Sequence, residues 1–220
     1  MSGGAIVGGV AVVVILGILV YFGFQNLAQA KALGNVVHPS RLGMFSGRAV
    51  TLVGRPQSLY RGSDPFRERY LWFKKEYQEK RVDYSSDNNR ERWVTVKTET
   101  ADYGLELELS DGTMISVTND PSEVYGTESN TQGGGWGSDY RVVTTSLPRV
   151  PMLTVCGELR MTGSGNSRIV SGDKVGLIFT PEDPATRAKW EYIKGMACLT
   201  LGPALVLGVA WYLTSKFGAF

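Results

Sequence analysis

The side chains that could perform catalysis are few and scattered. A catalytic site needs a nucleophile or a base with its partners within reach, and no Ser/His/Asp, Cys/His or metal-ligand spacing is present. Glu106 and Glu108 could form an acid/base pair, but their spacing suits one solvated face of a strand better. We therefore expect no catalytic residues and no enzyme. The candidates for a weaker alternative, an enzyme at a membrane surface, are His38, Asp102, Glu106, Asp111 and Glu158.

Metal and cofactor chemistry is also poorly supported. Two cysteines, Cys156 and Cys198, and one histidine cannot supply a zinc site built from several Cys and His ligands. The glycine-rich run at residues 133–137 would cradle phosphate only between a strand and a helix start, and neither is evident. We expect no metal and no cofactor. Trp136, at the tip of this loop, is instead a candidate for binding a partner protein or the membrane interface, or for covering the domain core.

Two apolar segments without charged side chains bracket the polar part of the chain, at residues 5–24 and 195–215. Each has about 20 residues, which as a helix crosses a hydrocarbon core of about 30 Å. Trp211 and Tyr212 close the second segment as interfacial aromatics. The first could be a cleaved signal peptide, but Met1 to Gly4 lacks the basic residues that open one. The sequence predicts two membrane anchors.

Charges near the span ends predict the orientation. Lysine and arginine collect on the domain side, with only Lys216 and the N-terminal amine beyond the spans, which places the domain in the cytoplasm and both termini outside. We expect an integral protein of the bacterial inner membrane. Small residues let helices approach closely in lipid, so the anchors should pack on each other or on a neighbouring subunit through Gly4, Gly8, Ala204 and Gly208. Trp211 is a further candidate for contact with a partner.

Short strand patterns fill the region between the anchors. Residues 105–109 alternate leucine and glutamate, and Asp111-Gly112 then predicts a tight hairpin turn before residues 113–118. We expect a mainly β protein, with a small β-barrel or sandwich domain held between two transmembrane helices. The other predicted strands are residues 48–54, 69–77, 92–98, 141–146, 153–160, 167–170 and 175–179. The predicted parts are an outside tail (1–4), a helix with extension (5–33), the β domain (34–180), a helix leading into the second span (185–216) and an outside tail (217–220).

This order of parts resembles the GIDE-type domain of mulan-like, membrane-anchored ubiquitin ligases and their bacterial and archaeal relatives. The matching residues are 49–54 (AVTLVG), 70–73 (YLWF) with Arg92-Trp93, the Asp111-Gly112 hairpin, and 153–159 (LTVCGEL). The ligases carry a RING finger with zinc ligands after the second span, and this sequence has none. The resemblance therefore implies a tethered β domain that binds protein, without ligase activity.

The function expected from these features is that of a non-catalytic, membrane-anchored scaffold or interaction protein. An accessory subunit of a larger membrane complex, for example a respiratory or photosynthetic one, would have this composition. Its partners would be other membrane proteins and the lipid bilayer. With 23 basic and 21 acidic residues there is no nucleic-acid footprint. The first alternative is a lipid- or ligand-binding barrel at the membrane surface.

Overall fold

The structure, a computed structural model, describes residues 3–83, 90–135, 137–161, 166–173 and 175–217. The chain divides into two compact units. One contains the apolar helices, from residues 1–36 and 183–220, and the other is the β domain of residues 37–182. Strands make up 40% of the chain, which confirms a mainly β protein.

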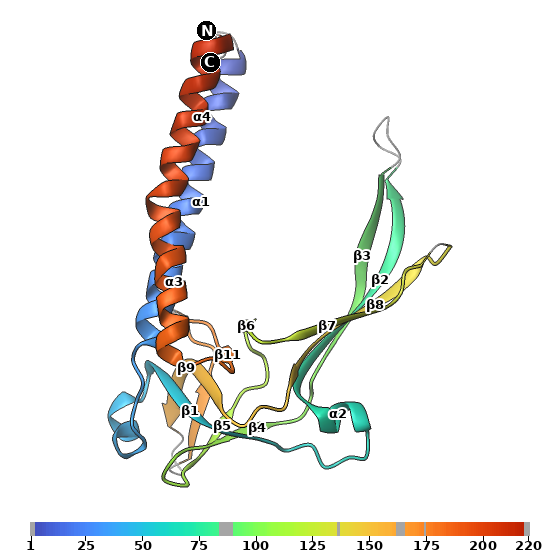
Figure 1. Cartoon of the computed structure of the whole chain (residues 1–220), viewed down its shortest axis with the longest axis vertical. Helices are drawn as coiled ribbons and strands as arrows, with labels where there is room; N and C mark the ends of the chain where they lie inside the picture. Colours follow the sequence, from blue (N-terminus) through green and yellow to red (C-terminus); the bar gives the residue numbers. More distant parts are fainter. Residues whose placement is uncertain (1–2, 84–89, 136, 162–165, 174, 218–220) are drawn as a thin grey trace. The chain divides into compact units, whose positions relative to one another are not determined.

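The helical unit is an antiparallel pair (Figure 1). Helix α1 (Gly3–Leu33) ends where Gly34 N donates to Ala30 O at 3.0 Å, as the sequence predicted. Helix α3 (Pro184–Leu199) begins at Asp183, whose carboxylate accepts from Thr186 N at 3.1 Å. Two stretches of this unit, Val10–Leu33 and Pro184–Tyr212, are long and apolar enough to cross a bilayer.

The sequence predicted that the second apolar segment continues one uninterrupted helix, but the structure has two helices there. Helix α3 ends at Leu199, and α4 (Leu201–Phe217) begins after one intervening residue, Thr200. Pro203 has no N–H to donate to the carbonyl four residues earlier, so the hydrogen-bond ladder is broken at this turn. Thr200 Oγ1 donates to Met196 O at 2.7 Å and satisfies a carbonyl there.

The β domain is built on a closed five-stranded barrel. Its strands are β1 (Arg48–Ser58), β4 (Leu105–Glu108), β5 (Met114–Val117), β9 (Leu153–Met161) and β10 (Ser167–Val170). They pair in the order β1-β4-β5-β10-β9, and β9 returns to β1. All pairs are antiparallel except β5 with β10. This is the connectivity of an OB-type Greek-key barrel.

Side chains fill the barrel. Alternate residues of each strand point inward, and the leucines of β4 are buried while its glutamates are only half-buried, as the alternating pattern predicted. The core includes Val50, Leu52, Leu107, Leu159 and Ile169, each with no exposed surface. The barrel is therefore a packed core and not an open ligand cavity.

Strand β1 continues through Pro56, where the sequence predicted a break. Residues 48–54 pair with β9, and residues 55–58 pair only with β4. Because one side of β1 is unpaired from Arg55 onward, the missing N–H of Pro56 costs no ladder hydrogen bond there. The predicted turn at Asp111-Gly112 is confirmed: Gly112 has φ +83°, and Asp111 accepts from Thr113 N at 2.9 Å.

A second, four-stranded sheet extends from the barrel, and we call it the arm (Figure 1). Its strands pair in the order β3-β2-β8-β7. They are β2 (Tyr70–Asp83), β3 (Arg90–Thr100), β7 (Glu128–Gly133) and β8 (Tyr140–Pro148). Residues 119–140 are rich in glycine, serine, threonine and asparagine, a composition that predicts one long loop. The structure instead has strand β7 within this segment.

Four shorter elements complete the β domain. They are η1 (Pro39–Phe45), α2 (Pro65–Arg69), β6 (Glu123–Val124) and β11 (Ile178–Thr180). Strand β11 pairs with β9 on one side and with β6 on the other. Helix α2 lies just before β2, capped by Asp64, whose carboxylate accepts from Phe66 N at 2.9 Å.

Candidate functional site

Three of the five residues considered for catalysis, Asp102, Glu106 and Glu158, lie in unrelated settings. Asp102 pairs with Arg67, and Glu158 with Arg160 at 2.8 Å. Glu106 is half-buried on β4. His38 is exposed and accepts from Ser40 N at the start of η1, as expected for a surface residue.

Asp111 and His38, the other two, lie close enough for their charges to interact. The pKa of Asp111 is lowered mainly by hydrogen bonds from Thr113, with a smaller contribution from the charge of His38. Ser40 Oγ lies 2.9 Å from Nδ1 of His38, so a hydroxyl does contact the imidazole here, but His38, Ser40 and Asp111 are all exposed side chains. Within the described ranges, no three His, Cys, Asp or Glu side chains are grouped as metal ligands.

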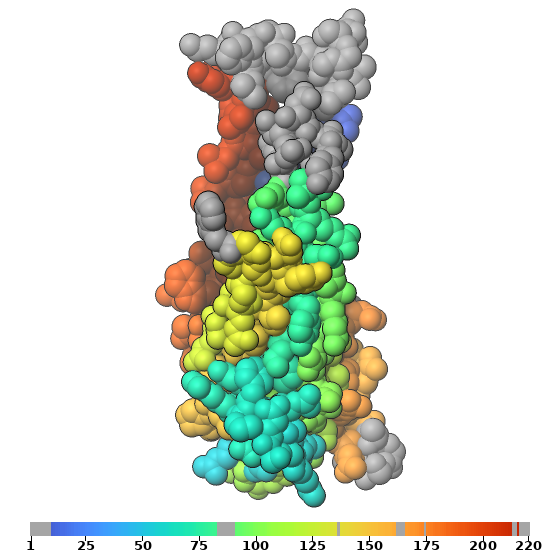
Figure 2. All heavy atoms as spheres, turned by 90° about the vertical axis from the view of Figure 1, so that its right-hand side faces the viewer, coloured from blue at the N-terminus to red at the C-terminus, as the bar shows by residue number. Residues whose placement is uncertain are grey.

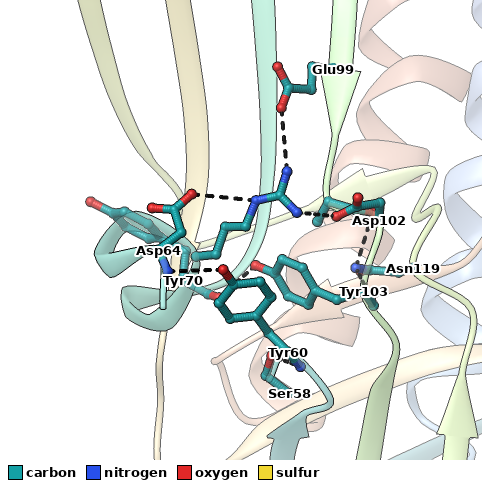
Figure 3. A network of polar contacts seen from close by, with 10 residues as sticks. Ser58, Tyr60, Asp64, Tyr70, Glu99, Asp102, Tyr103 and Asn119 are labelled. Carbon is teal, nitrogen blue, oxygen red and sulfur yellow. Dashed lines mark hydrogen bonds and ion pairs between the residues drawn. The ribbon is translucent and has the colours of Figure 1, made fainter. Parts of the chain in front are cut away.

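The densest polar network lies where the arm leaves the barrel, and we call it the joint (Figure 3). Arg67 on α2 contacts three carboxylates there. Its guanidinium lies 2.6 Å from Asp102, 3.5 Å from Asp64 and 3.7 Å from Glu99. Asp64 belongs to the cap of α2, Glu99 to β3, and Asp102 to the segment leading into β4. One side chain therefore ties three segments of chain together.

Aromatic rings surround this arginine. Its guanidinium carbon lies 5.8 Å from the ring centroid of Tyr60 and 5.9 Å from that of Phe73. Tyr103 is buried beside Tyr60, and its hydroxyl donates to Tyr70 O at 2.8 Å. Burial raises the pKa of Tyr103 to about 12, although the charge of Arg67 opposes this shift. The joint is therefore a packed, desolvated contact at its base and an ionic one at its rim.

Beyond the joint, the arm is a single layer of sheet. Side chains of directly paired residues share a face, so the register defines two faces. Figure 2 looks onto the arm, with β7 and β8 in yellow beside β2 and β3 in green. We call one of these two faces of the arm the tyrosine face. Its residues are Lys75, Tyr77, Glu79, Arg81, Arg92, Val94, Lys97, Glu99, Asn130, Gln132, Tyr140, Val142 and Thr144. The other is the tryptophan face: Lys74, Glu76, Gln78, Lys80, Glu91, Trp93, Thr95, Thr98, Ser129, Thr131, Arg141 and Val143.

Both faces are accessible. Every residue of β7 is exposed, and Tyr140 on the tyrosine face is 65% exposed. On the tryptophan face the guanidinium of Arg141 lies 4.5 Å from the ring of Trp93 and donates to Gln78 at 2.6 Å. A hollow of about 560 Å³ adjoins it, lined by Lys80, Glu91, Trp93, Gly134, Gly135, Gly137 and Ser138. A second hollow of about 340 Å³ lies at Gly47, Glu158 and Asp173.

The helices approach most closely at two glycines that the sequence reading did not select. A Cβ on Gly23 would lie 2.6 Å from Leu199, and one on Gly195 would lie 2.9 Å from Leu27. Gly208 has no atom within 4 Å of its Cβ position. The described residues of the two helices thus show no contact at Gly208. Its use against a neighbouring subunit stays a prediction.

The other predicted contact residues have varied outcomes. Ala204 lies in α4, where its amide donates to Thr200 O at 3.3 Å, and Trp211 is 74% exposed. Gly4 and Gly8 lie in α1, in the part whose side-chain surroundings are outside the described structure. Trp136 lies outside the described residues.

Helix α3 also holds a buried ionic pair. Arg187 and Glu191, one turn apart, form an ion pair with side chains 8% and 2% exposed. Lys194 approaches the same carboxylate at 3.0 Å. A buried charge is costly when its partner is lost, so this pair must persist for α3 to keep its packing.

Comparison with known proteins adds no further assignment. A scan against protein-family models, a search of curated proteins and a search of solved structures each find no match to this chain. Its class is therefore defined by geometry: a five-stranded barrel with an inserted sheet, flanked in sequence by two apolar helices.

Proposed function

We propose that this chain is a membrane-anchored, non-catalytic interaction protein whose arm presents a binding surface. One observation carries the proposal: the arm is a single layer of sheet, exposed along β7 and on much of both faces, yet fixed to the barrel at the joint. A sheet edge has unpaired backbone groups that accept a partner strand. A rigid base and an open surface suit recognition better than catalysis.

Aromatic positions support the membrane part of the proposal. Trp190 and Tyr192 on α3 and Trp211 and Tyr212 on α4 are all more than half exposed. Tyr192 and Tyr212 are 20 residues apart in the sequence, which corresponds to about 30 Å of helix and matches the hydrocarbon core. Aromatic belts of this spacing mark the two interfaces of a bilayer. We propose that α1 and α3–α4 cross the membrane as a hairpin.

The charge asymmetry places the β domain on the cytoplasmic side in this proposal. The arrangement of spans around a β domain, and its likeness to GIDE-type domains, favour a scaffold or accessory subunit. Ligand binding within the barrel is less favoured, because the barrel interior is filled.

Photocrosslinking in native membranes tests this function. A photoreactive amino acid replaces Thr131 on β7, and a matched chain carries it at exposed Arg61, outside the arm. The same partner protein should be crosslinked from Thr131 in repeated preparations and not from Arg61. Equal, partner-free labelling at both sites would contradict an interaction surface on the arm. Carbonate extraction of the same membranes should leave the chain in the pellet.

A further inference from the structure

We propose that the tyrosine face of the arm binds the anionic headgroups of the bilayer in which the chain is anchored. This inference rests on the proposed function, because it requires the helices to be in a membrane. It names the lipid surface as a ligand of the arm, in addition to any protein partner.

The carrying observation is a pair of like charges. Arg81 on β2 lies directly opposite Arg92 on β3, and both side chains are exposed. Like charges directly opposite on one face of a sheet destabilise it. The carboxylate of Glu79 lies 3.4 Å from the guanidinium of Arg81. Among the described side chains at this end of the face, it is the one carboxylate available to the two arginines. An anion between the two guanidinium groups would offset their repulsion, and phosphate matches the planar fork of arginine.

The charges of the two faces differ in how far they are matched. On the tryptophan face, Lys74 lies 2.6 Å from Glu76 and Lys80 lies 2.6 Å from Glu91. On the tyrosine face, the carboxylates among the side chains that the structure describes are Glu79 and Glu99, and Glu99 already accepts from Tyr77 at 3.0 Å. The cations there are Lys75, Arg81, Arg92 and Lys97. Arg141 is a third cation on the tryptophan face, so among the described side chains three cations face two carboxylates there, against four cations and two carboxylates on the tyrosine face. The larger excess of positive charge therefore belongs to the tyrosine face.

The remaining side chains of this face suit a lipid interface. Tyr77, Tyr140, Val94 and Val142 lie among the cations in register. Tyrosine has an apolar ring and a polar tip, and arginine has an apolar stem, so both are stable at the headgroup level. Each cation near an anionic surface strengthens binding by about fivefold.

The test uses the full chain in nanodiscs made of zwitterionic phosphatidylcholine alone or with anionic phosphatidylglycerol. A polarity-sensitive NBD dye is attached at Gln132→Cys on the tyrosine face. In a matched chain it is attached at Thr131→Cys, the next residue, on the tryptophan face. Cys198→Ala removes the second native thiol, and Cys156 is buried. We expect a blue shift at position 132 only in anionic nanodiscs, weakened by 0.5 M salt.

Two double variants of equal charge decide whether the arginine pair is responsible. Arg81→Gln with Arg92→Gln should weaken the binding constant of the arm for the anionic surface about 25-fold. Lys74→Gln with Lys80→Gln, on the tryptophan face, should leave it unchanged. Circular dichroism checks that each variant is folded.

Several outcomes overturn the inference: no lipid-dependent shift at position 132, an equal shift at position 131, or a shift that survives loss of both arginines. If carbonate extraction leaves the chain in the membrane but the dye at position 132 shows no blue shift, the lipid-binding inference fails and the proposed anchoring stands. If carbonate extracts the chain, both the proposed anchoring and the lipid-binding inference fail.

Discussion

Gly23 and Gly195 face each other across the two apolar helices, and neither position has room for a Cβ. A Cβ on Gly195 would lie 3.0 Å from Gly23 O, and one on Gly23 would lie 3.2 Å from Gly195 O. The backbones are therefore in contact at this level. In lipid, where no hydrophobic effect drives helices together, such close approach supplies the packing.

The first prediction concerns this crossing point. Gly195→Leu should force the helices apart at a cost of about 1–3 kcal/mol, as other overpacking substitutions do. Gly17→Leu and Gly208→Leu, at positions with no atom within 4 Å, should have little effect. Disulfide yield between Leu19→Cys and Gly202→Cys, in a chain without Cys198, measures helix pairing. Equal yields in all three variants would show that the glycine contact is unimportant.

The second prediction concerns the joint. Arg67→Gln removes three ionic contacts and two ring contacts, so we expect a loss of roughly 1–2 kcal/mol, more than for an isolated exposed pair. Hydrogen exchange in β2 and β3 should accelerate while β9 stays protected. Arg61→Gln, a nearby exposed arginine, is the control. Unchanged exchange in the arm of the Arg67 variant would mean that the strands hold the arm without the joint.

The third prediction is a pH dependence from Cys156. Burial raises the pKa of this thiol to about 11 from 9.0 when unfolded, partly opposed by a hydrogen bond with Thr51. The folded state thus favours the protonated thiol. Its contribution is fully present below pH 9 and is lost as the pH rises from about 9 to about 11. Over that range the loss approaches about 2.7 kcal/mol.

Thermal unfolding in detergent between pH 8 and pH 10 measures this loss. The stability of the Cys156→Ala variant should fall less steeply with pH over the same range, whatever its stability at pH 8. The Tyr103→Phe variant should show the same fall of stability with pH below pH 10 as the parent chain. The pKa of Tyr103 is raised from 10.0 to about 12, so its ionisation affects stability only above pH 10. If the stability of the parent chain and of Cys156→Ala falls equally with pH, the Cys156 thiol is not the cause of the loss.

The fourth prediction concerns the barrel. A Cβ on Gly157 would lie 2.6 Å from Ile169 and 2.8 Å from Val170 O, so β9 approaches β10 with no space for a side chain. Gly157→Ala should destabilise the domain by about 1–3 kcal/mol. Gly43→Ala, where nothing lies within 4 Å, should be neutral in the same denaturation experiment. Equal stability of both variants would show that the barrel relaxes around the added methyl group.

Local patterns predicted the parts of this fold that depend on neighbouring residues. The alternation of Leu105 to Leu109 and the Asp111-Gly112 turn predicted the β4–β5 hairpin, and the apolar runs predicted the helices. Strand β7 was missed because its polar residues have no buried face, and only pairing with β8 makes it a strand.

The candidate site could be predicted only in part, because its residues meet through long-range contacts. Arg67 reaches Glu99 and Asp102 across more than 30 residues of sequence, so no local pattern predicts these contacts. Likewise, Gly195 stood at the first position of a predicted span, but its partner Gly23 was visible only once the helices were paired.

The arm is made from two separate insertions into the barrel sequence. Strands β2 and β3 lie between barrel strands β1 and β4, while β7 and β8 lie between β5 and β9, and the sheet joins them only through β2 and β8. Deleting either insertion would leave the other as an isolated hairpin, which is marginally stable in water. The two insertions are therefore expected to have been acquired and retained together. During synthesis, the first must also wait unpaired until the ribosome has delivered the second.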